Sequence, residues 1–244
     1  MFRDPRQGAV AGLVRILVAP DVEALAARAA ELVAARIAEG SCRLALAGGN
    51  TPRPVYRRLA ERPELPWSGV EIFFGDERLV PPDDPASNEG MARATLLDAL
   101  PAPGPRVHRI ETERGAEGAA THYATLLSKP LDLVLLGMGG DGHTASLFPG
   151  GPLDGAAVIA TESPVPPHRR VSLSLSTLNA ADQVVLLVAG EDKATRLAEA
   201  FAQRVRPMTE RRLPVALLAP RGELWWLLDA AAASALPSSV MEET

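Results

Sequence analysis

Short apolar runs alternate with amphipathic stretches along most of this chain. The apolar runs predict β-strands at residues 13–18, 43–47, 70–74, 132–136, 157–160, 171–175, 183–189, 215–219 and 224–228. The amphipathic stretches predict helices at residues 21–39 (with Asp21 as the N-cap), 55–59, 90–100, 116–127, 190–205 and 230–235. Such alternation is typical of a parallel sheet covered by helices. We therefore predict an α/β fold of three layers, a mostly parallel sheet with helices on both faces, in a modified Rossmann-like arrangement.

The length of 244 residues fits one large α/β domain or two smaller ones. No internal repeat or low-complexity linker divides the chain. We therefore expect a single domain over residues 13–244, preceded by a loose N-terminal arm at residues 1–12. A small subdomain within residues 150–180 is an alternative that the pattern leaves open.

Composition narrows the possible partners. Hydrophobic residues make up 47% of the chain, and the formal net charge is -5 with acids and bases mixed along it. Because no basic block could neutralise a nucleic-acid backbone, we expect no nucleic-acid partner. The apolar runs fall short of the roughly 18 residues of a membrane span, so we expect no membrane partner. The only cysteine, Cys42, favours a packed, inert thiol, and we expect a cytoplasmic protein.

A glycine-rich turn follows the predicted strand at residues 132–136. Its glycines match the G-x-G-x-x-G pattern of dinucleotide-binding proteins, at Gly137, Gly139 and Gly142. Glu162 follows at the spacing of the acid that binds a ribose. That function also needs a full helix directly after the glycines, and the Pro-Gly-Gly-Pro segment at 149–152 ends any helix there. The sequence therefore disfavours a dinucleotide, and we expect no cofactor.

Polar loops follow four of the predicted strands, at residues 48–51, 75–78, 137–144 and 190–193. The carboxyl ends of parallel strands meet at one edge of a sheet, so we expect these loops to gather there. The first, Gly48-Gly49-Asn50-Thr51, precedes a helix and is a candidate phosphate cradle. An ordinary turn with Asn50 or Thr51 as helix cap is the alternative. Arg78 and Lys193 are candidate cations for the same phosphate, unless they are simply solvated.

Asp141 and His143 are the candidate catalytic residues. An imidazole exchanges protons near neutral pH, and a carboxylate beside it could fix its tautomer and stabilise the imidazolium. The alternative is a histidine that only hydrogen-bonds its own loop. Residues that could border the same site are Asp76, Gly139, Gly140, Thr144 and Arg169. No H-E-x-x-H or similar ligand spacing is present, so we expect no metal.

Four segments together resemble the 6-phosphogluconolactonase family, in the family's order and over nearly the whole chain. They are residues 47–52, residues 74–78 with Ser87 and Asn88, residues 136–149, and residues 190–193. The run Gly-Asp-Gly-His-Thr-Ala-Ser-Leu-Phe-Pro is the most specific of them. Asn50 departs from the family, which more often has serine there, although an amide can still donate to a phosphate.

The resemblance implies hydrolysis of 6-phospho-D-glucono-1,5-lactone to 6-phosphogluconate in the oxidative pentose phosphate pathway. It implies a sheet related to that of sugar-phosphate isomerases and deaminases. It also implies that His143 is the general base, that Asp141 supports it, and that Arg78, Lys193, Asn50 and Thr51 hold the phosphate. The expected partner is then a small sugar-phosphate lactone. The oligomeric state stays open, and a monomer is compatible with the sequence.

Two other functions remain as alternatives. A glucosamine-6-phosphate deaminase uses similar loops, but that family follows Gly-His with Asn-Glu-Pro and uses the glutamate in catalysis. This chain has Ser146-Leu147-Phe148-Pro149, whose leucine and phenylalanine cannot transfer a proton. A non-catalytic sugar-phosphate sensor is the second alternative, because a fold alone does not fix a function. Asp141 and His143 disfavour it.

Overall fold

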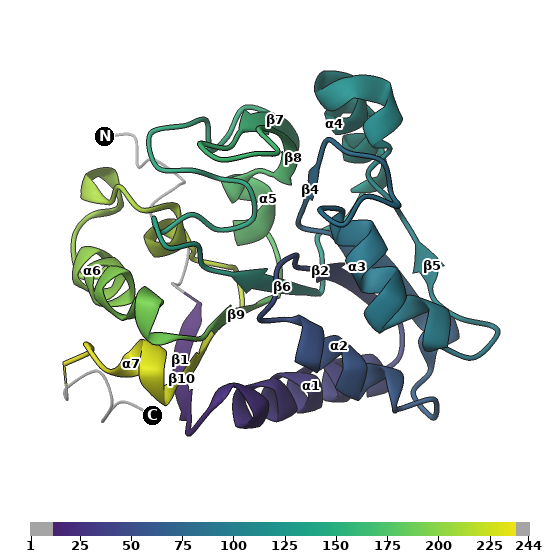
Figure 1. Ribbon diagram of the computed structural model, residues 1–244, viewed down its shortest axis with the longest axis horizontal. Coiled ribbons are helices and arrows are strands. Elements are labelled where there is room, and N and C mark those ends of the chain that lie inside the picture. The colour runs from purple at the N-terminus through teal and green to yellow at the C-terminus, as the bar shows by residue number, and fades with distance from the viewer. Residues whose placement is uncertain (1–11, 238–244) are drawn as a thin grey trace, which may run out of the picture.

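The computed structural model describes residues 12–237, which form a large parallel sheet and a small antiparallel one (Figure 1). The large sheet has seven strands in the order β1-β10-β9-β6-β2-β3-β5, and its neighbouring strands are parallel. These strands are β1 (Leu13–Ala19), β2 (Cys42–Leu46), β3 (Val70–Phe74), β5 (Arg106–Val107), β6 (Leu133–Gly137), β9 (Gln183–Val188) and β10 (Glu223–Asp229). The small sheet joins β4 (Asp76–Arg78), β8 (Arg169–Leu173) and β7 (Val158–Glu162) in that order.

Helices cover both faces of the large sheet. The helices of the described residues are α1 (Val22–Ala38), α2 (Arg53–Ala60), α3 (Asn88–Thr95), α4 (Gly115–Leu126), α5 (Leu175–Asn179), α6 (Ala194–Arg204) and α7 (Ala230–Ala233). Of these, α4 packs mainly against β7 and β8 of the small sheet. The crossovers through α1 and α2 run across the sheet in one direction, and the crossover through α6 runs in the other. Because parallel crossovers are right-handed, opposite directions place their helices on opposite faces. The predicted three-layer α/β fold is confirmed.

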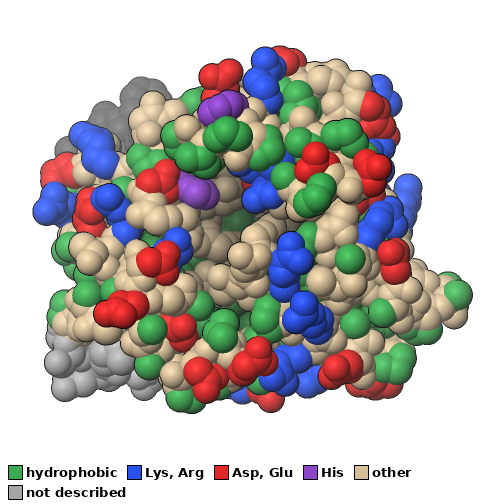
Figure 2. All heavy atoms as spheres, in the orientation of Figure 1, with side chains coloured by type: hydrophobic (Ala, Val, Ile, Leu, Met, Phe, Trp, Pro, Cys, Tyr) green, Lys and Arg blue, Asp and Glu red, His purple; other side chains and the backbone are tan. Residues whose placement is uncertain are grey.

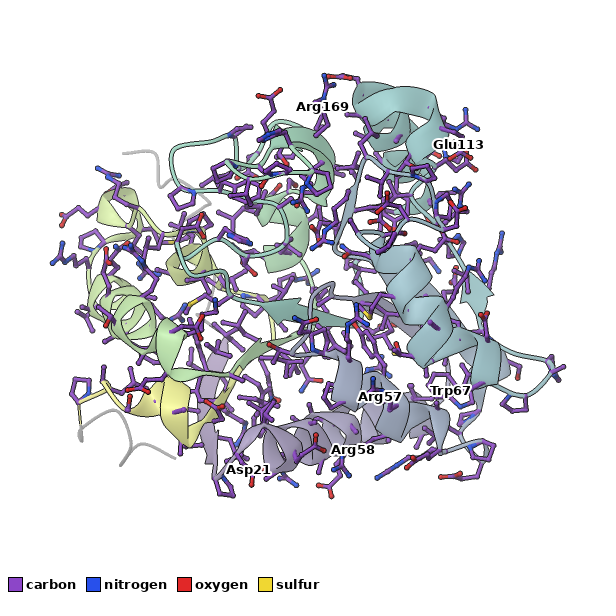
Figure 3. The ribbon with its side chains drawn as sticks, viewed as in Figure 1. Asp21, Arg57, Arg58, Trp67, Glu113 and Arg169 are labelled. Atoms are coloured by element: carbon purple, nitrogen blue, oxygen red, sulfur yellow. The ribbon has the colours of Figure 1, made fainter. Side chains whose placement is uncertain are left out.

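Local sequence explains how these elements start and what they bury. The carboxylate of Asp21 accepts a hydrogen bond from the Ala24 amide at 2.8 Å and caps α1, as predicted (Figure 3). The apolar stripe of α1 packs against the sheet, with Leu25, Val33 and Ile37 fully buried. On the opposite face, Phe201 of α6 lies 4.7 Å from the ring of Trp226 in β10.

The strand order reverses between β6 and β2. The chain continues from β2 to β3 on one side, and from β6 to β9 on the other. The loops that follow β2 and β6 therefore separate beyond the carboxyl edge of the sheet. Such a reversal opens a crevice, which is where ligands bind in this class of sheet.

Two predicted elements are wrong. Residues 215–219 were expected as a strand, but Pro214–Leu217 form a short 3-10 helix. Residues 75–78 were expected as a loop, but Asp76–Arg78 form β4. In both cases a partner that is distant in the sequence determines the local structure. The Val215 amide donates to the Gly142 carbonyl, and β4 pairs with β8.

The region at residues 150–180 contains β7, β8 and α5, of which the sequence did not predict α5. Its sheet is completed by β4, which comes from a distant part of the chain, so this region is not a separate sheet by itself. Of the predicted N-terminal arm at residues 1–12, residues 1–11 lie outside the described residues.

Candidate active site

A cleft of about 640 Å³ opens at the carboxyl edge of the large sheet, where the strand order reverses. Figure 2 shows the molecule hollowed at the centre of this face, with basic side chains and a histidine around the hollow. The predicted site residues that line the cleft are Gly48, Gly49, Asn50, Thr51, Asp76, Arg78, Gly139, His143 and Lys193. The structure thus brings residues from all four predicted loops into one cavity.

His143 and Asp141 contact each other directly in the turn after β6. The Nδ1 atom of His143 lies 2.5 Å from Oδ1 of Asp141, and the same oxygen accepts the backbone N–H of His143 at 3.1 Å. Partial burial acts to raise the pKa of Asp141, but the His143 amide and the charge of the imidazole outweigh it and lower that pKa. Asp141 is therefore an ionised acceptor. Among the described residues, Nε2 of His143 has no hydrogen-bond partner, so it is available for a proton transfer.

The glycines of this turn make room for the histidine. A Cβ on Gly139 would lie 2.0 Å from Cε1 of His143, so any larger residue would displace the ring. Gly142 has a φ of +87°, and a Cβ there would lie 2.9 Å from Leu213. No helix follows these glycines, since Thr144 and Leu147 form an isolated β-bridge. The glycine pattern therefore shapes a pocket for an imidazole, and the helix that a dinucleotide site needs after its glycines is replaced by this turn.

The loop after β2 is equally constrained. A Cβ on Gly48 would lie 2.0 Å from Oδ1 of Asn88, and Gly49 has a φ of +92°. The residue that caps α2 is Pro52, with no side-chain hydrogen bond at the cap, so the alternative that Asn50 or Thr51 caps this helix is wrong. Among the described residues, neither of those two side chains has a hydrogen-bond partner. Both are free to contact a ligand in the cleft.

Two arginines lie side by side in the cleft. Arg78 of β4 and Arg170 of β8 are paired in the register of the small sheet. Arg78 donates to the Ala86 carbonyl at 2.6 Å, and its Nε is buried without a partner. Burial, and then the charge of Arg78, lower the pKa of Arg170. Within residues 12–237 neither guanidinium has a carboxylate in ion-pair distance. This end of the cleft is therefore suited to an anion.

Lys193 lies at the start of α6, and its Nζ is 2.9 Å from the exposed carboxylate of Asp192. Because that carboxylate is largely solvated, a dianionic ligand could compete with it for the ammonium group.

A buried polar network joins the catalytic turn to the rest of the cleft. Asp76 accepts the hydroxyl of Ser146 at 2.6 Å and the side-chain amide of Asn88 at 3.2 Å. Its neighbour Glu77 accepts three backbone amides, those of Arg78, Asn88 and Glu89. Burial raises the pKa of Glu77, against the opposing effect of these amides. Asp76 faces the cleft, whereas Glu77 holds the first turn of α3.

The remaining predicted residues lie behind or outside the cleft. Thr144 is fully buried, and its hydroxyl donates to the Gly137 carbonyl at 2.9 Å. Gly140 and Asp141 do not line the cavity. Arg169 does not border it either: this exposed side chain binds Glu117 at 2.8 Å, beside α4 (Figure 3). Successive residues of a strand point to opposite sides, so the border position belongs to Arg170 instead.

Sequence reasoning also missed some residues that line the cleft. They are Ser146, Phe148, Ser163, Val165 and Asp192, among others. Phe148 packs 4.7 Å from the His143 ring. A signal existed for Ser146 and Phe148, because both fall in the motif that carries His143. For Arg170 the signal was ambiguous, since Arg169 and Arg170 differ only in which side of a strand they occupy.

Among residues 12–237, no group of three or more His, Cys, Asp or Glu side chains is placed to hold a metal ion. In that same part of the chain, no helix is long and apolar enough to cross a membrane. Cys42 is buried, and burial raises the pKa of its thiol to about 12.

Comparison with known proteins gives consistent matches. Residues 20–226 match the family model described as glucosamine-6-phosphate isomerases/6-phosphogluconolactonase. The chain is 38% identical over 236 residues to a 6-phosphogluconolactonase of a Nostoc species, covering 90% of this chain and 97% of that protein. It is 39% identical to the 6-phosphogluconolactonase of Rattus norvegicus, covering 92% and 94%. A solved 6-phosphogluconolactonase of Trypanosoma brucei is similar in fold, with a TM-score of 0.79 and 29% identity over 91% of this chain and 98% of that one.

Proposed function

The chain belongs to the glucosamine-6-phosphate isomerase and 6-phosphogluconolactonase family, and we propose that it hydrolyses 6-phospho-D-glucono-1,5-lactone to 6-phosphogluconate. The reaction is a step of the oxidative pentose phosphate pathway. The observation that carries the proposal is the His143–Asp141 pair, which shares one cleft with two guanidinium groups that have no carboxylate at ion-pair distance within residues 12–237. One end of this cleft is suited to a phosphate, and the other holds a base for the lactone carbonyl.

The phosphate lies at the loop after β2 and the two arginines. Asn50 and Thr51 donate to it from the loop, together with the backbone N–H groups of Gly48 and Gly49. Arg78 supplies a guanidinium, and Arg170, its neighbour in the small sheet, supplies a second. Lys193 closes the site from the start of α6. Guanidinium groups suit phosphate because their N–H donors form a planar fork.

His143 acts as the general base. Its Nε2 takes a proton from a water molecule as the water oxygen bonds to the lactone carbonyl carbon. The tetrahedral intermediate then collapses, the bond from that carbon to the ring oxygen breaks, and the ring oxygen takes the proton back from the imidazolium. Asp141 stabilises the imidazolium through Nδ1. Such a base contributes on the order of 10²–10⁴ in rate, and one donor to the oxyanion on the order of 10²–10³.

The direct test is acid release. Purified protein is added to freshly generated phosphogluconolactone, and proton release is followed at constant pH against the spontaneous hydrolysis. Release well above that background is expected. A protein that binds 6-phosphogluconate in calorimetry but does not accelerate acid release would instead be a sugar-phosphate sensor.

The deaminase alternative is disfavoured by the residues after His143. Leu147 is fully buried and Phe148 nearly so, and Phe148 packs on the histidine ring. Neither side chain can transfer a proton at the position where the deaminases have a glutamate. No release of ammonia from glucosamine 6-phosphate is expected, and such release would reopen this alternative.

We propose further that residues 13–244 act as one domain, because the small sheet joins β4 to the distant strands β7 and β8, and that the protein acts as a monomer. Light scattering after size-exclusion chromatography tests the monomer.

A cytoplasmic location is also proposed, because the one thiol, Cys42, is buried and unpaired, as suits a reducing compartment. Cell fractionation tests the location.

A further inference from the structure

The chain has only two tyrosines, and both are fully buried with their hydroxyl groups on strand ends. Tyr56 lies in α2, directly after the loop that lines the phosphate end of the cleft. Its hydroxyl accepts the backbone N–H of Ala47 at 2.8 Å and donates to the carbonyl of the same residue at 2.8 Å. One side chain thus satisfies both backbone groups of a single residue.

Ala47 needs this partner because the sheet splits beside it. The pairing of β2 with β6 ends at Ala45 and Val134. Ala47 is two residues further along the chain, so its N–H and C=O point to the same side of β2 as those of Ala45, toward β6. They lie beyond the last paired residues of the two strands. Two buried backbone groups there would otherwise lack partners. The Tyr56 hydroxyl takes the place of the missing strand at the point where β2 and β6 separate.

This contact also closes the loop between Ala47 and Tyr56. Its other end is fixed by the backbone, because the Tyr56 amide donates to Pro52 at 3.0 Å and the Arg53 amide to Asn50 at 3.2 Å. The side chains of Asn50 and Thr51 contribute no hydrogen bond to the loop within the described residues. The shape of the loop therefore depends on its anchored ends.

We propose that Tyr56 is a positioning residue, which holds the Gly48–Thr51 loop in its phosphate-binding shape through Ala47. The inference rests on the proposed function, since it assigns this loop to the phosphate. Burial raises the pKa of Tyr56, so its hydroxyl keeps the proton that it donates to the carbonyl.

Tyr123 provides a matched comparison. Its hydroxyl accepts the Phe74 amide at 2.7 Å and donates to the Phe74 carbonyl, at the end of β3 beyond the short strand β5. The segment that follows Phe74 is held independently of Tyr123. Its strand β4 pairs with β8, and the side chain of Glu77 accepts backbone N–H groups from the start of α3. Loss of the Tyr123 hydroxyl therefore removes similar hydrogen bonds from the core without releasing the phosphate loop.

The test compares Tyr56→Phe with Tyr123→Phe, each of which removes one oxygen and keeps the ring. Both are expected to lower the melting temperature. Only Tyr56→Phe is expected to raise KM for phosphogluconolactone, on the order of tenfold, with kcat changed by less than about twofold. Glucono-1,5-lactone, which has no phosphate, serves as the second substrate. The preference in kcat/KM for the phosphorylated lactone should fall by the same factor in Tyr56→Phe and stay unchanged in Tyr123→Phe.

Equal KM changes in the two variants would overturn the proposal, as would an unchanged KM in Tyr56→Phe. If the wild-type protein does not turn over the lactone, the proposed function has failed instead. Calorimetry with 6-phosphogluconate then tests Tyr56 separately, and binding weakened about tenfold only in Tyr56→Phe supports it. Hydrogen exchange on the wild type needs no variant: the Ala47 amide should be protected like that of Ala45, and fast exchange would contradict its hydrogen bond to the tyrosine.

Discussion

The imidazole of His143 is held from three sides. Asp141 binds its Nδ1, Gly139 leaves room for its edge, and Phe148 packs against its face. Asp141 also accepts the backbone N–H of His143, but loss of the imidazole leaves that hydrogen bond in place, and the side chain is one-third exposed. At the scale of single residues, catalysis and stability are therefore separable.

We predict that His143→Ala lowers kcat by about 10²–10⁴, because the base is lost, with little change in melting temperature. The measurement is acid release from fresh lactone, corrected for spontaneous hydrolysis. His122→Ala is the control, since His122 on α4 is exposed to the same extent but lies outside the cleft. Normal turnover by His143→Ala would refute the assignment of the base.

The pH dependence of kcat/KM depends on the charge of Asp141. Because the pKa of Asp141 is lowered, its carboxylate stays ionised while the base takes up a proton, and kcat/KM of the wild type should fall in acid with a slope of one proton. Asp141→Asn removes the negative charge that favours the imidazolium. The acid limb should then move to lower pH, and the plateau should fall by about tenfold or more because the tautomer is no longer fixed. An unmoved acid limb would show that Asp141 does not act on the base.

At the scale of elements, the turn after β6 has almost no room for side chains near the base. Gly139→Ala should lower kcat on the order of 10², since a displacement of about 1 Å suffices for that loss, with a smaller effect on KM. Gly140→Ala is the neighbouring comparison and should lose less, because the nearest atom to a Cβ there is Lys193 Nζ at 3.6 Å. Steady-state kinetics of the two variants measure these losses in kcat and KM. Equal losses would mean that the clash with the ring is unimportant.

The start of α3 gives a prediction for stability. Glu77→Ala leaves three backbone amides without their acceptor, two of them buried (Asn88 and Glu89) and one partly buried (Arg78), and should destabilise the protein by about 3 kcal/mol or more. Asp21→Ala also removes a helix cap, but an exposed one, and should cost about 1 kcal/mol. Urea unfolding of both variants measures the difference. Similar losses would contradict the role of burial at Glu77.

At the scale of the whole molecule, the small sheet joins distant parts of the chain, so we predict one cooperative unfolding transition. The described tryptophans, Trp67, Trp225 and Trp226, all lie outside the small sheet. Their fluorescence should nevertheless change together with far-UV circular dichroism. Two separate transitions would show that the small sheet unfolds independently.

Addition of 6-phosphogluconate at 100 times its Kd should stabilise the protein by about 2.7 kcal/mol.

The sequence predicted elements best where the signal is local. The cap of α1 and the apolar strands of the large sheet follow from neighbouring residues. The prediction of a strand at residues 215–219 was wrong because the apolar pattern there serves a different partner, the turn at Gly142. The two-residue strand β5 was too short for any pattern to indicate it.

The sequence by itself determined the α/β class, the polar segments that follow four of the strands, and the neighbouring pair Asp141 and His143, because periodicity and short spacing are properties of the local chain. Only the tertiary structure decided that Arg170, not Arg169, lines the cleft, because a register shift of one residue moves a side chain to the other side of a strand. Only the tertiary structure placed the Tyr56 hydroxyl on Ala47, because the gap that it fills exists only where two assembled strands separate.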